Sequence, residues 1–146
     1  MTDLFDFSQV TLQEIGDKVQ VSGNATSKWN YDPTDHLEAS VTVLYFYRRE
    51  WVNTLISMVF KDFCNVIYDE KQEVYRIWSK YRKDKCLLNG TKFIYETFTV
   101  DMMLKVPMIG PEGRHKVIIM VKAIDINQMV RNPIFCTEII GEVIRV

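Results

Sequence analysis

Residues 41–47 read VTVLYFY and give the clearest indication of the fold. Every second side chain in this stretch is a valine or a tyrosine, and both residue types favour strands. Because successive side chains of a strand point to opposite faces of its sheet, this period of two predicts a β-strand. Residues 48–50 then indicate a turn, and the apolar, β-branched run at 52–59 indicates a second strand.

The same period extends toward the N-terminus. Residues 10–12 and 19–21 alternate apolar and polar positions, and the pair Gly16-Asp17 separates the two stretches. The turn-rich residues 31–35 then precede the stretch at 41–47. Strands joined by such short turns favour antiparallel hairpins.

The C-terminal half repeats this organisation. Residues 93–97 alternate, prolines and glycines break the chain between 107 and 113, and residues 116–124 and 134–146 predict two long strands. The chain of 146 residues is near the usual size of one domain. The sequence therefore predicts a single mainly β domain over residues 1–146, an antiparallel β-cup or sandwich of about seven strands.

One region, at about residues 60–83, departs from the period of two. Phe60, Phe63, Cys64 and Ile67 stand at helical spacing, which predicts one helical insert. Its polar positions hold six basic residues: Lys71, Arg76, Lys80, Arg82, Lys83 and Lys85. This cationic face is explained either by solvation or by contact with a partner.

Charge and hydropathy exclude several classes of partner. Lys plus Arg number 18 against 19 Asp plus Glu, so no basic excess indicates a nucleic acid or an anionic membrane as the main partner. The longest apolar run, residues 117–121, is far shorter than the roughly 20 residues of a membrane-spanning helix.

Catalytic and metal-binding signatures are missing from the sequence. The two histidines, His36 and His115, do not stand at metal-ligand spacing with a cysteine or with each other. There is no glycine-rich phosphate loop, no nucleophile elbow and no His-Glu-x-x-His motif. We therefore expect neither enzymatic activity nor a cofactor.

Two features bear on the cellular compartment. Asn24 and Asn89 begin N-glycosylation sequons, which either mark exposed acceptor sites or arise by chance. The three cysteines indicate either a secreted protein with one unpaired thiol or a cytosolic protein with three buried thiols. The chain starts without the features of a secretory signal, so such a signal is absent or has been removed.

Methionine is the residue that points most directly to a ligand. Several of the seven methionines stand at 102–103 and 108, around a proline-bounded loop. Methionine adapts to irregular shapes and is common at promiscuous binding surfaces, although an ordinary core also uses it. The cluster is a mild indication of an apolar ligand.

Seven short stretches stand in an order and spacing that resemble a known group of proteins. They are VTL at 10–12, VSGNAT at 21–26, Phe63-Cys64, CLLNG at 86–90, Val106-Pro107 followed by GRHKV at 113–117, and Phe135-Cys136. In this order they resemble the insect chemosensory CheB proteins and, more distantly, the ganglioside activator protein. The resemblance covers nearly the whole chain and rests on order and spacing, because none of the stretches is a catalytic motif.

This resemblance implies a secreted β-cup whose inner walls hold acyl chains. It also implies a disulfide between Cys64 and Cys86, with Cys136 either reduced or paired outside this chain, and it favours glycosylation at Asn24 and Asn89. The activator presents lipid to a hydrolase. The CheB proteins are associated with contact pheromone detection, for which long-chain hydrocarbons are plausible ligands.

Strand positions of like parity then predict the residues that line the cup: Val43, Tyr45, Leu55, Phe93, Tyr95, Met103, Val106 and Ile119. Met108 is expected at the mouth, on a loop tip that either contacts a lipid surface or folds back into the core. Trp51 falls on the activator's apolar loop, so the resemblance places it at the mouth too, although it could simply cap the core.

The expected function is extracellular binding and transport, or presentation, of a lipid or hydrophobic pheromone, with no chemistry done on it. A receptor or a membrane surface is a further candidate partner. The alternative is a ligand-free extracellular adaptor that contacts a receptor or an enzyme through the basic helix face.

Overall fold

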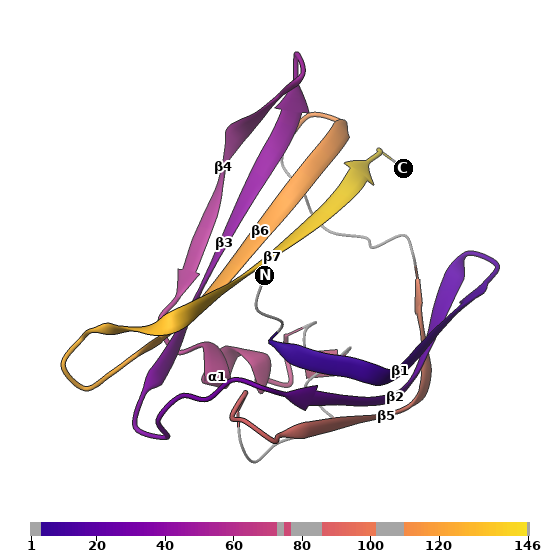
Figure 1. Ribbon diagram of the computed structural model, residues 1–146. Helices are drawn as coiled ribbons and strands as arrows, with labels where there is room; N and C mark the ends of the chain where they lie inside the picture. Colours follow the sequence, from indigo (N-terminus) through magenta and orange to yellow (C-terminus); the bar gives the residue numbers. More distant parts are fainter. Residues whose placement is uncertain (1–3, 73–74, 77–85, 102–109, 146) are drawn as a thin grey trace. The chain divides into compact units, whose positions relative to one another are not determined.

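The computed structural model describes residues 4–72, 75–76, 86–101 and 110–145 (Figure 1). Seven strands and one short helix are found in these residues. They are β1 (Phe5–Ile15), β2 (Lys18–Ser27), β3 (His36–Tyr47), β4 (Glu50–Phe60), α1 (Phe63–Ile67), β5 (Lys92–Asp101), β6 (Gly113–Ile124) and β7 (Val130–Val143). The mainly β, antiparallel class predicted from the sequence is confirmed.

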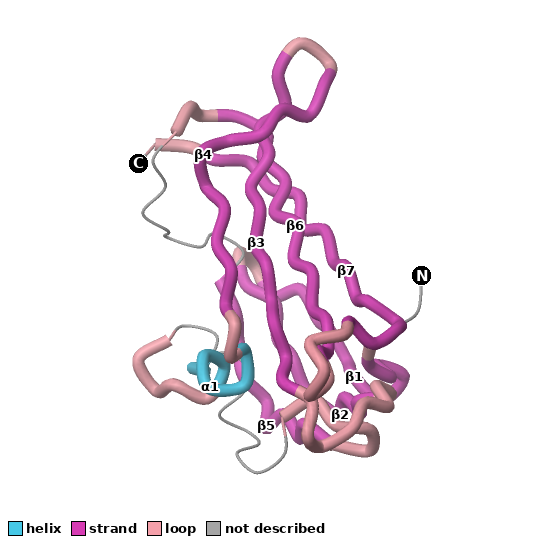
Figure 2. Tube along the Cα trace, turned by 90° about the vertical axis from the view of Figure 1, so that its left-hand side faces the viewer, coloured by secondary structure: helices cyan, strands magenta, loops and turns pink. Residues whose placement is uncertain are grey.

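The strands form two antiparallel sheets. One has three strands in the order β1-β2-β5, and the other has four in the order β4-β3-β6-β7, which Figure 2 shows side by side. The hairpins β1–β2, β3–β4 and β6–β7 pair neighbours in sequence, whereas β2–β5 and β3–β6 join remote segments. The chain divides into two compact units, residues 1–33 with 64–106 and residues 34–63 with 107–146.

The predicted turn at residues 48–50 is a two-residue hairpin loop. Tyr47 pairs with Glu50, which already belongs to β4. Arg48 and Arg49 both have positive φ, at 49° and 71°. Two-residue hairpin loops of type I′ have positive φ at both central positions and usually carry Asn or Gly there. The turn type therefore could not be predicted from the two arginines in the sequence.

The helical insert predicted at about residues 60–83 is smaller within the described residues. Phe60 is the last residue of β4, and α1 begins at Phe63 and ends at Ile67. Tyr75 and Arg76 are helical as well. Four of the predicted basic positions, Lys80, Arg82, Lys83 and Lys85, lie outside the described residues.

Asp69 explains why α1 ends early. Its N–H donates to the carbonyl of Val66 (3.3 Å), and its carboxylate accepts hydrogen bonds from Lys71 N (3.0 Å) and Gln72 Nε2 (3.4 Å). An aspartate side chain that binds backbone donors in this way favours a turn over a continued helix. The bond from Lys71 N, followed by that from Gln72, lowers the pKa of Asp69 below its ordinary value.

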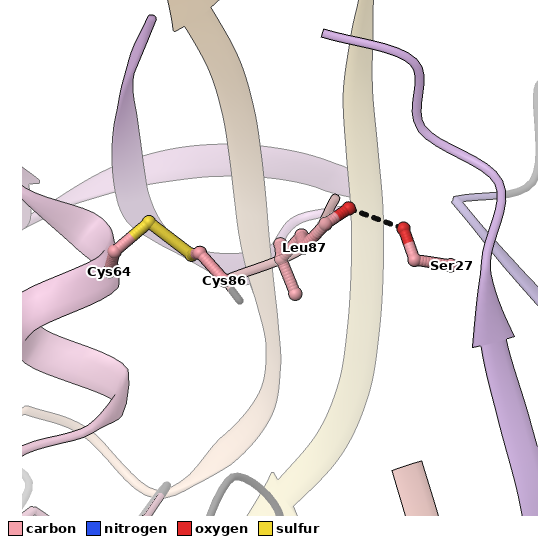
Figure 3. Close-up of a disulfide and its surroundings, with 4 residues drawn as sticks. All are labelled: Ser27, Cys64, Cys86 and Leu87. Carbon is pink, nitrogen blue, oxygen red and sulfur yellow. Dashed lines mark hydrogen bonds between the residues drawn. A yellow bond between two sulfur atoms is a disulfide. The ribbon is translucent and has the colours of Figure 1, made fainter. Parts of the chain in front are cut away.

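Ser27, the last residue of β2, joins the end of that strand to residues 87–91 of the first unit. It is 1% exposed, its N–H donates to Thr91 O (2.8 Å), and its carbonyl accepts from Gly90 N (2.8 Å). Its hydroxyl donates to the carbonyl of Leu87, the residue after the disulfide cysteine Cys86 (Figure 3). Residues 87–91 are therefore held against the end of β2 before β5 begins.

The disulfide expected from the resemblance is present. Cys64 in α1 bonds to Cys86, with a sequence separation of 22, and Cys136 on β7 is a free, exposed cysteine. The bond connects α1 to the segment that Ser27 fixes (Figure 3).

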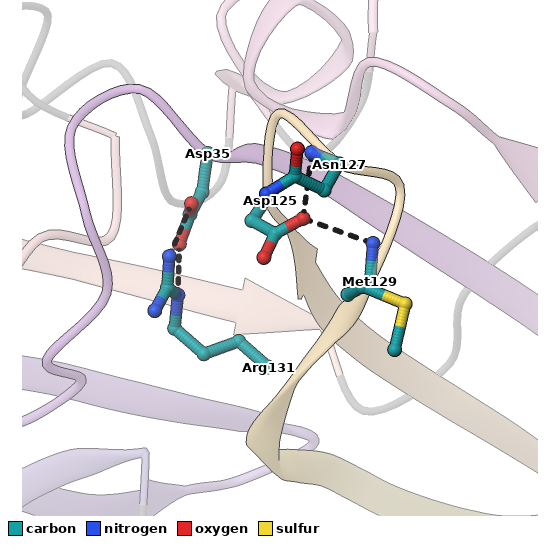
Figure 4. A network of polar contacts seen from close by, with 5 residues as sticks. All are labelled: Asp35, Asp125, Asn127, Met129 and Arg131. Atoms are coloured by element: carbon teal, nitrogen blue, oxygen red, sulfur yellow. Dashed lines mark hydrogen bonds and ion pairs between the residues drawn. The ribbon is translucent and has the colours of Figure 1, made fainter.

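Two aspartates order the loops of the second unit (Figure 4). Asp35, before β3, accepts two hydrogen bonds from the guanidinium of Arg131 on β7, at 2.5 and 2.9 Å. Asp125 closes the β6–β7 loop, because its carboxylate accepts from the N–H groups of Asn127 (2.8 Å) and Met129 (2.9 Å). Such Asx turns replace backbone hydrogen bonds within the loop.

The first prediction concerns Gly23, which lies where the register shifts in β2–β5 pairing and has φ 103°. A Cβ at this position would overlap the carbonyl oxygen of Gln9. Gly23→Ala should therefore lower the free energy of unfolding by about 3 kcal/mol or more. Gly16→Ala is the control, because Gly16 also has positive φ but open space around it, and should lose only about 1 kcal/mol. Equal urea midpoints for the two variants would contradict the steric argument.

The second prediction concerns the thiols. In the folded protein only Cys136 should react with an aromatic disulfide reagent, whereas all three cysteines should react after reduction and unfolding. Closing a loop of this length contributes roughly 3 kcal/mol, so replacing Cys64 and Cys86 together with Ser should cost about that much stability. More than one reactive thiol before reduction, or a Cys136-containing peptide disulfide within the monomer, would refute the pairing.

Candidate apolar ligand-binding face

The β3–β6 pairing decides which side chains share a face of the four-stranded sheet. The two strands pair in continuous register from His36 opposite Ile124 to Tyr45 opposite His115. Directly opposite residues point to the same face. Val41 therefore lies beside Ile119, and Val43 beside Val117.

The outer strands extend this face. Met58 on β4 is opposite Val41, and Ile139 on β7 is opposite Val117. Thr137, opposite Ile119, is the polar exception in these two rows. The apolar face therefore consists of six residues: Val41, Val43, Met58, Val117, Ile119 and Ile139.

Exposure varies across the apolar face. Val43 at its centre is buried, Val41, Val117 and Ile119 are half-buried, and Met58 and Ile139 are 46% and 54% exposed. Nearer the start of β3 the same face continues into side chains that are buried: Leu37, Ala39, Val121, Ala123 and Phe135. The apolar face is therefore continuous with the buried core but is itself partly open.

The opposite face of this sheet is mixed, because it carries ion pairs as well as the exposed apolar side chains Val59, Met120 and Ile140. Lys116 pairs with Glu138 at 3.0 Å, and Lys122 pairs with Glu38 at 2.8 Å. Trp51 lies on this opposite face, directly across from Phe46, with ring centroids 5.0 Å apart. Nζ of Lys116 stands 4.7 Å from the Trp51 ring centroid, a cation–π contact. Trp51 is thus on the other side of the sheet from Val43.

Leu55 stands in a bulge of β4. Leu44 pairs with Asn53 and Thr42 pairs with Ser57, so three residues of β4 face Val43 alone. The Thr54 hydroxyl fills the gap, because it donates to the Val43 carbonyl (2.7 Å) and accepts from Ile56 N (3.1 Å). Leu55, in the middle of the bulge, is fully exposed.

The remaining predicted lining residues do not lie on this sheet. Phe93 and Tyr95 belong to β5 in the other unit, where both are buried. Phe93 packs edge-on against Phe5, with centroids 5.8 Å apart, and Tyr95 lies 5.9 Å from Phe98. Met103, Val106 and Met108 lie outside the described residues. Within the second unit, Val43, Tyr45 and Ile119 of the predicted set share one face of the sheet.

Sequence reasoning missed four members of the apolar face: Val41, Met58, Val117 and Ile139. Residues 117–121 read VIIMV, an unbroken apolar run. A run without polar positions has no alternation from which the inward parity could be read. The alternating apolar pattern of β3 was the one signal for this face in the sequence. It identifies the other members only when the cross-strand partners of β3 are known.

Other kinds of site find no support in the described part of the chain. Among those residues, no group of three or more His, Cys, Asp or Glu could hold a metal ion. No helix within them is long and apolar enough to cross a membrane. Asn24 and Asn89, the two sequon asparagines, are both exposed.

No protein-family model matches this chain, and neither does any curated protein.

Proposed function

We propose that the protein binds the acyl or hydrocarbon chain of a lipid or hydrophobic pheromone on the apolar face, outside the cell, and carries or presents it without chemical change. The observation that carries this proposal is a set of apolar side chains from four strands on one face, several of which are only partly buried. Exposed apolar area of this kind favours contact with an apolar ligand, and the ion pairs Lys116–Glu138 and Lys122–Glu38 lie on the other face of the sheet.

The driving force would be removal of apolar surface from water. Each methylene that is fully buried contributes about 0.8 kcal/mol, so affinity should rise by at most about fourfold per added methylene. The affinity rises with ligand length only as long as each added methylene still contacts an apolar side chain of the protein. A hydrocarbon chain also needs no hydrogen-bond partner from Val41, Val43 or Ile119.

Secretion is part of the proposal. The Cys64–Cys86 disulfide is consistent with an oxidising, extracellular environment. The sequons at Asn24 and Asn89 have exposed asparagines and would accept glycans during passage through the secretory pathway. The resemblance to chemosensory and lipid-presenting proteins supports the β-cup and the pheromone or lipid ligand as further parts of the proposal.

The test uses two neighbouring isoleucines of β6. Ile119 belongs to the apolar face, whereas Ile118 is paired with Thr42 and Glu138 on the opposite face, and both are half-buried. Ile119→Ser should weaken binding of a fluorescent long-chain fatty acid by about tenfold, because it removes apolar contact and adds a hydroxyl. Ile118→Ser should leave the affinity unchanged.

Urea unfolding of the same two variants separates binding from stability. Both substitutions remove the same side chain from the same strand and should cost a similar amount of stability, about 1–3 kcal/mol. Equal affinities for both variants, or no measurable binding by the unaltered protein, would contradict the proposed function.

A further inference from the structure

The apolar face ends at a row that carries two polar groups. Tyr45 on β3 follows Val43 on the same face, and His115 on β6 precedes Val117. Tyr45 and His115 are direct cross-strand partners, and their ring centroids lie 5.0 Å apart. A phenol hydroxyl and an imidazole therefore stand together where the apolar rows stop.

Gly113 lets the Tyr45 ring lie close to the backbone. Gly113 has φ 124°, and a Cβ at this position would stand 3.2 Å from Cε2 of Tyr45. On its own strand the Tyr45 ring stacks with Tyr47, with centroids 6.2 Å apart and an interplanar angle of 23°. Packing against Gly113, Tyr47 and His115 restricts the ring of Tyr45 and so limits where its hydroxyl can lie.

His115 is oriented by a single hydrogen bond. The residue is 4% exposed, and Nδ1 lies 2.9 Å from the carbonyl oxygen of Gly113. A carbonyl oxygen only accepts, so Nδ1 carries the proton and Nε2 of the neutral ring is an acceptor. No hydrogen bond to Nε2 or to the Tyr45 hydroxyl is found within the described residues. In that part of the chain neither atom is a buried polar atom that lacks a partner, so Nε2 and the Tyr45 hydroxyl both reach the surface, where a ligand can contact them.

The position beside the imidazole is open. The residue opposite His115 on β7 is Gly141, which has no side chain. No atom of the described residues lies within 4 Å of the place where a Cβ of Gly141 would stand. A ligand group can therefore approach His115 from the side of β7.

We propose that Tyr45 and His115 bind the hydroxyl-bearing end of a long-chain alcohol or fatty acid whose chain lies on the apolar face. The ligand's O–H donates to Nε2 of His115, and its oxygen accepts from the Tyr45 hydroxyl. A carboxyl group makes the same two contacts, with its proton between its oxygen and Nε2. An alkane makes neither contact, and a methyl ester can only accept. This inference rests on the proposed function and adds the chemistry of the ligand's polar end.

The experiment compares four ligands of equal chain length: dodecanol, lauric acid, methyl laurate and dodecane. Their affinities are measured by displacement of a fluorescent apolar probe from the full chain. The unaltered protein should bind dodecanol and lauric acid about five- to tenfold more tightly than methyl laurate and dodecane, the effect expected of one or two buried hydrogen bonds.

Three variants should abolish this preference and leave the affinity for dodecane unchanged. Tyr45→Phe removes one oxygen atom, and His115→Asn removes Nε2 while its amide can still donate to Gly113 O. Gly141→Val fills the open position with a residue that favours strands. Tyr47→Phe is the matched control, because Tyr47 is on the same strand and face but is not opposite His115, and it should keep the preference.

The outcomes separate this inference from the function on which it rests. If Tyr45→Phe and His115→Asn remain folded and keep the preference, the polar subsite is refuted. It is also refuted if the unaltered protein binds all four ligands equally, although binding to the apolar face then stands. If none of the four ligands binds, the proposed function itself fails and the inference fails with it.

Discussion

The pairing of β3 with β6 is the constraint on which the second unit depends. Ten consecutive residue pairs, without a register shift, join the hairpin β3–β4 to the hairpin β6–β7 across about 80 residues of sequence. Without this ladder, two hairpins would each expose an edge and an apolar side, and isolated hairpins are marginally stable in water. Since side chains alternate, a slip of one residue between the two strands would put Val43 and Ile119 on opposite faces of the sheet. The register therefore determines both the stability of the unit and the existence of its apolar face.

The first unit solves the same problem with different means. Its hairpin β1–β2 is also completed by a remote strand, β5, and the intervening segment must be brought back to the end of β2. The Cys64–Cys86 disulfide ties two parts of that segment together covalently. The N–H, the carbonyl and the hydroxyl of Ser27 all form hydrogen bonds with residues 87–91. Buried polar groups are stable only when paired, so this small set of hydrogen bonds positions the start of β5. Both units are discontinuous in sequence for the same reason, because the sheet of each unit is completed by a segment that comes much later in the chain.

The candidate site follows from sheet geometry and not from a motif. No strand carries a recognisable binding motif. The cross-strand register places residues from different strands in one row, and these rows form the candidate site. Two rows, through Val41 and Val43, are apolar apart from Thr137, and the next row sets Tyr45 beside His115 and leaves a gap at Gly141. A face that is apolar along its length and polar at one end matches the build of an amphiphile with a chain and a single head. The charged partners Lys116, Glu138, Lys122 and Glu38 are confined to the other side of the sheet.

The sequence by itself determined the strand content and the approximate positions of all seven strands, because alternation and turn residues are local signals. The Cys64–Cys86 pair was expected only from the resemblance. The sequence did not determine which strands share a sheet. That choice depends on hydrogen bonds between remote segments, so the sequence did not show that Phe93 and Tyr95 belong to a different sheet from Val43. The bulge that leaves Leu55 exposed, the early end of α1 at Ile67 and the side of the sheet taken by Trp51 were likewise decided by tertiary pairing. A sequence period of two shows that successive side chains point to alternate faces of the sheet. Only pairing with the partner strand decides which face is apolar and which residues lie beside each side chain.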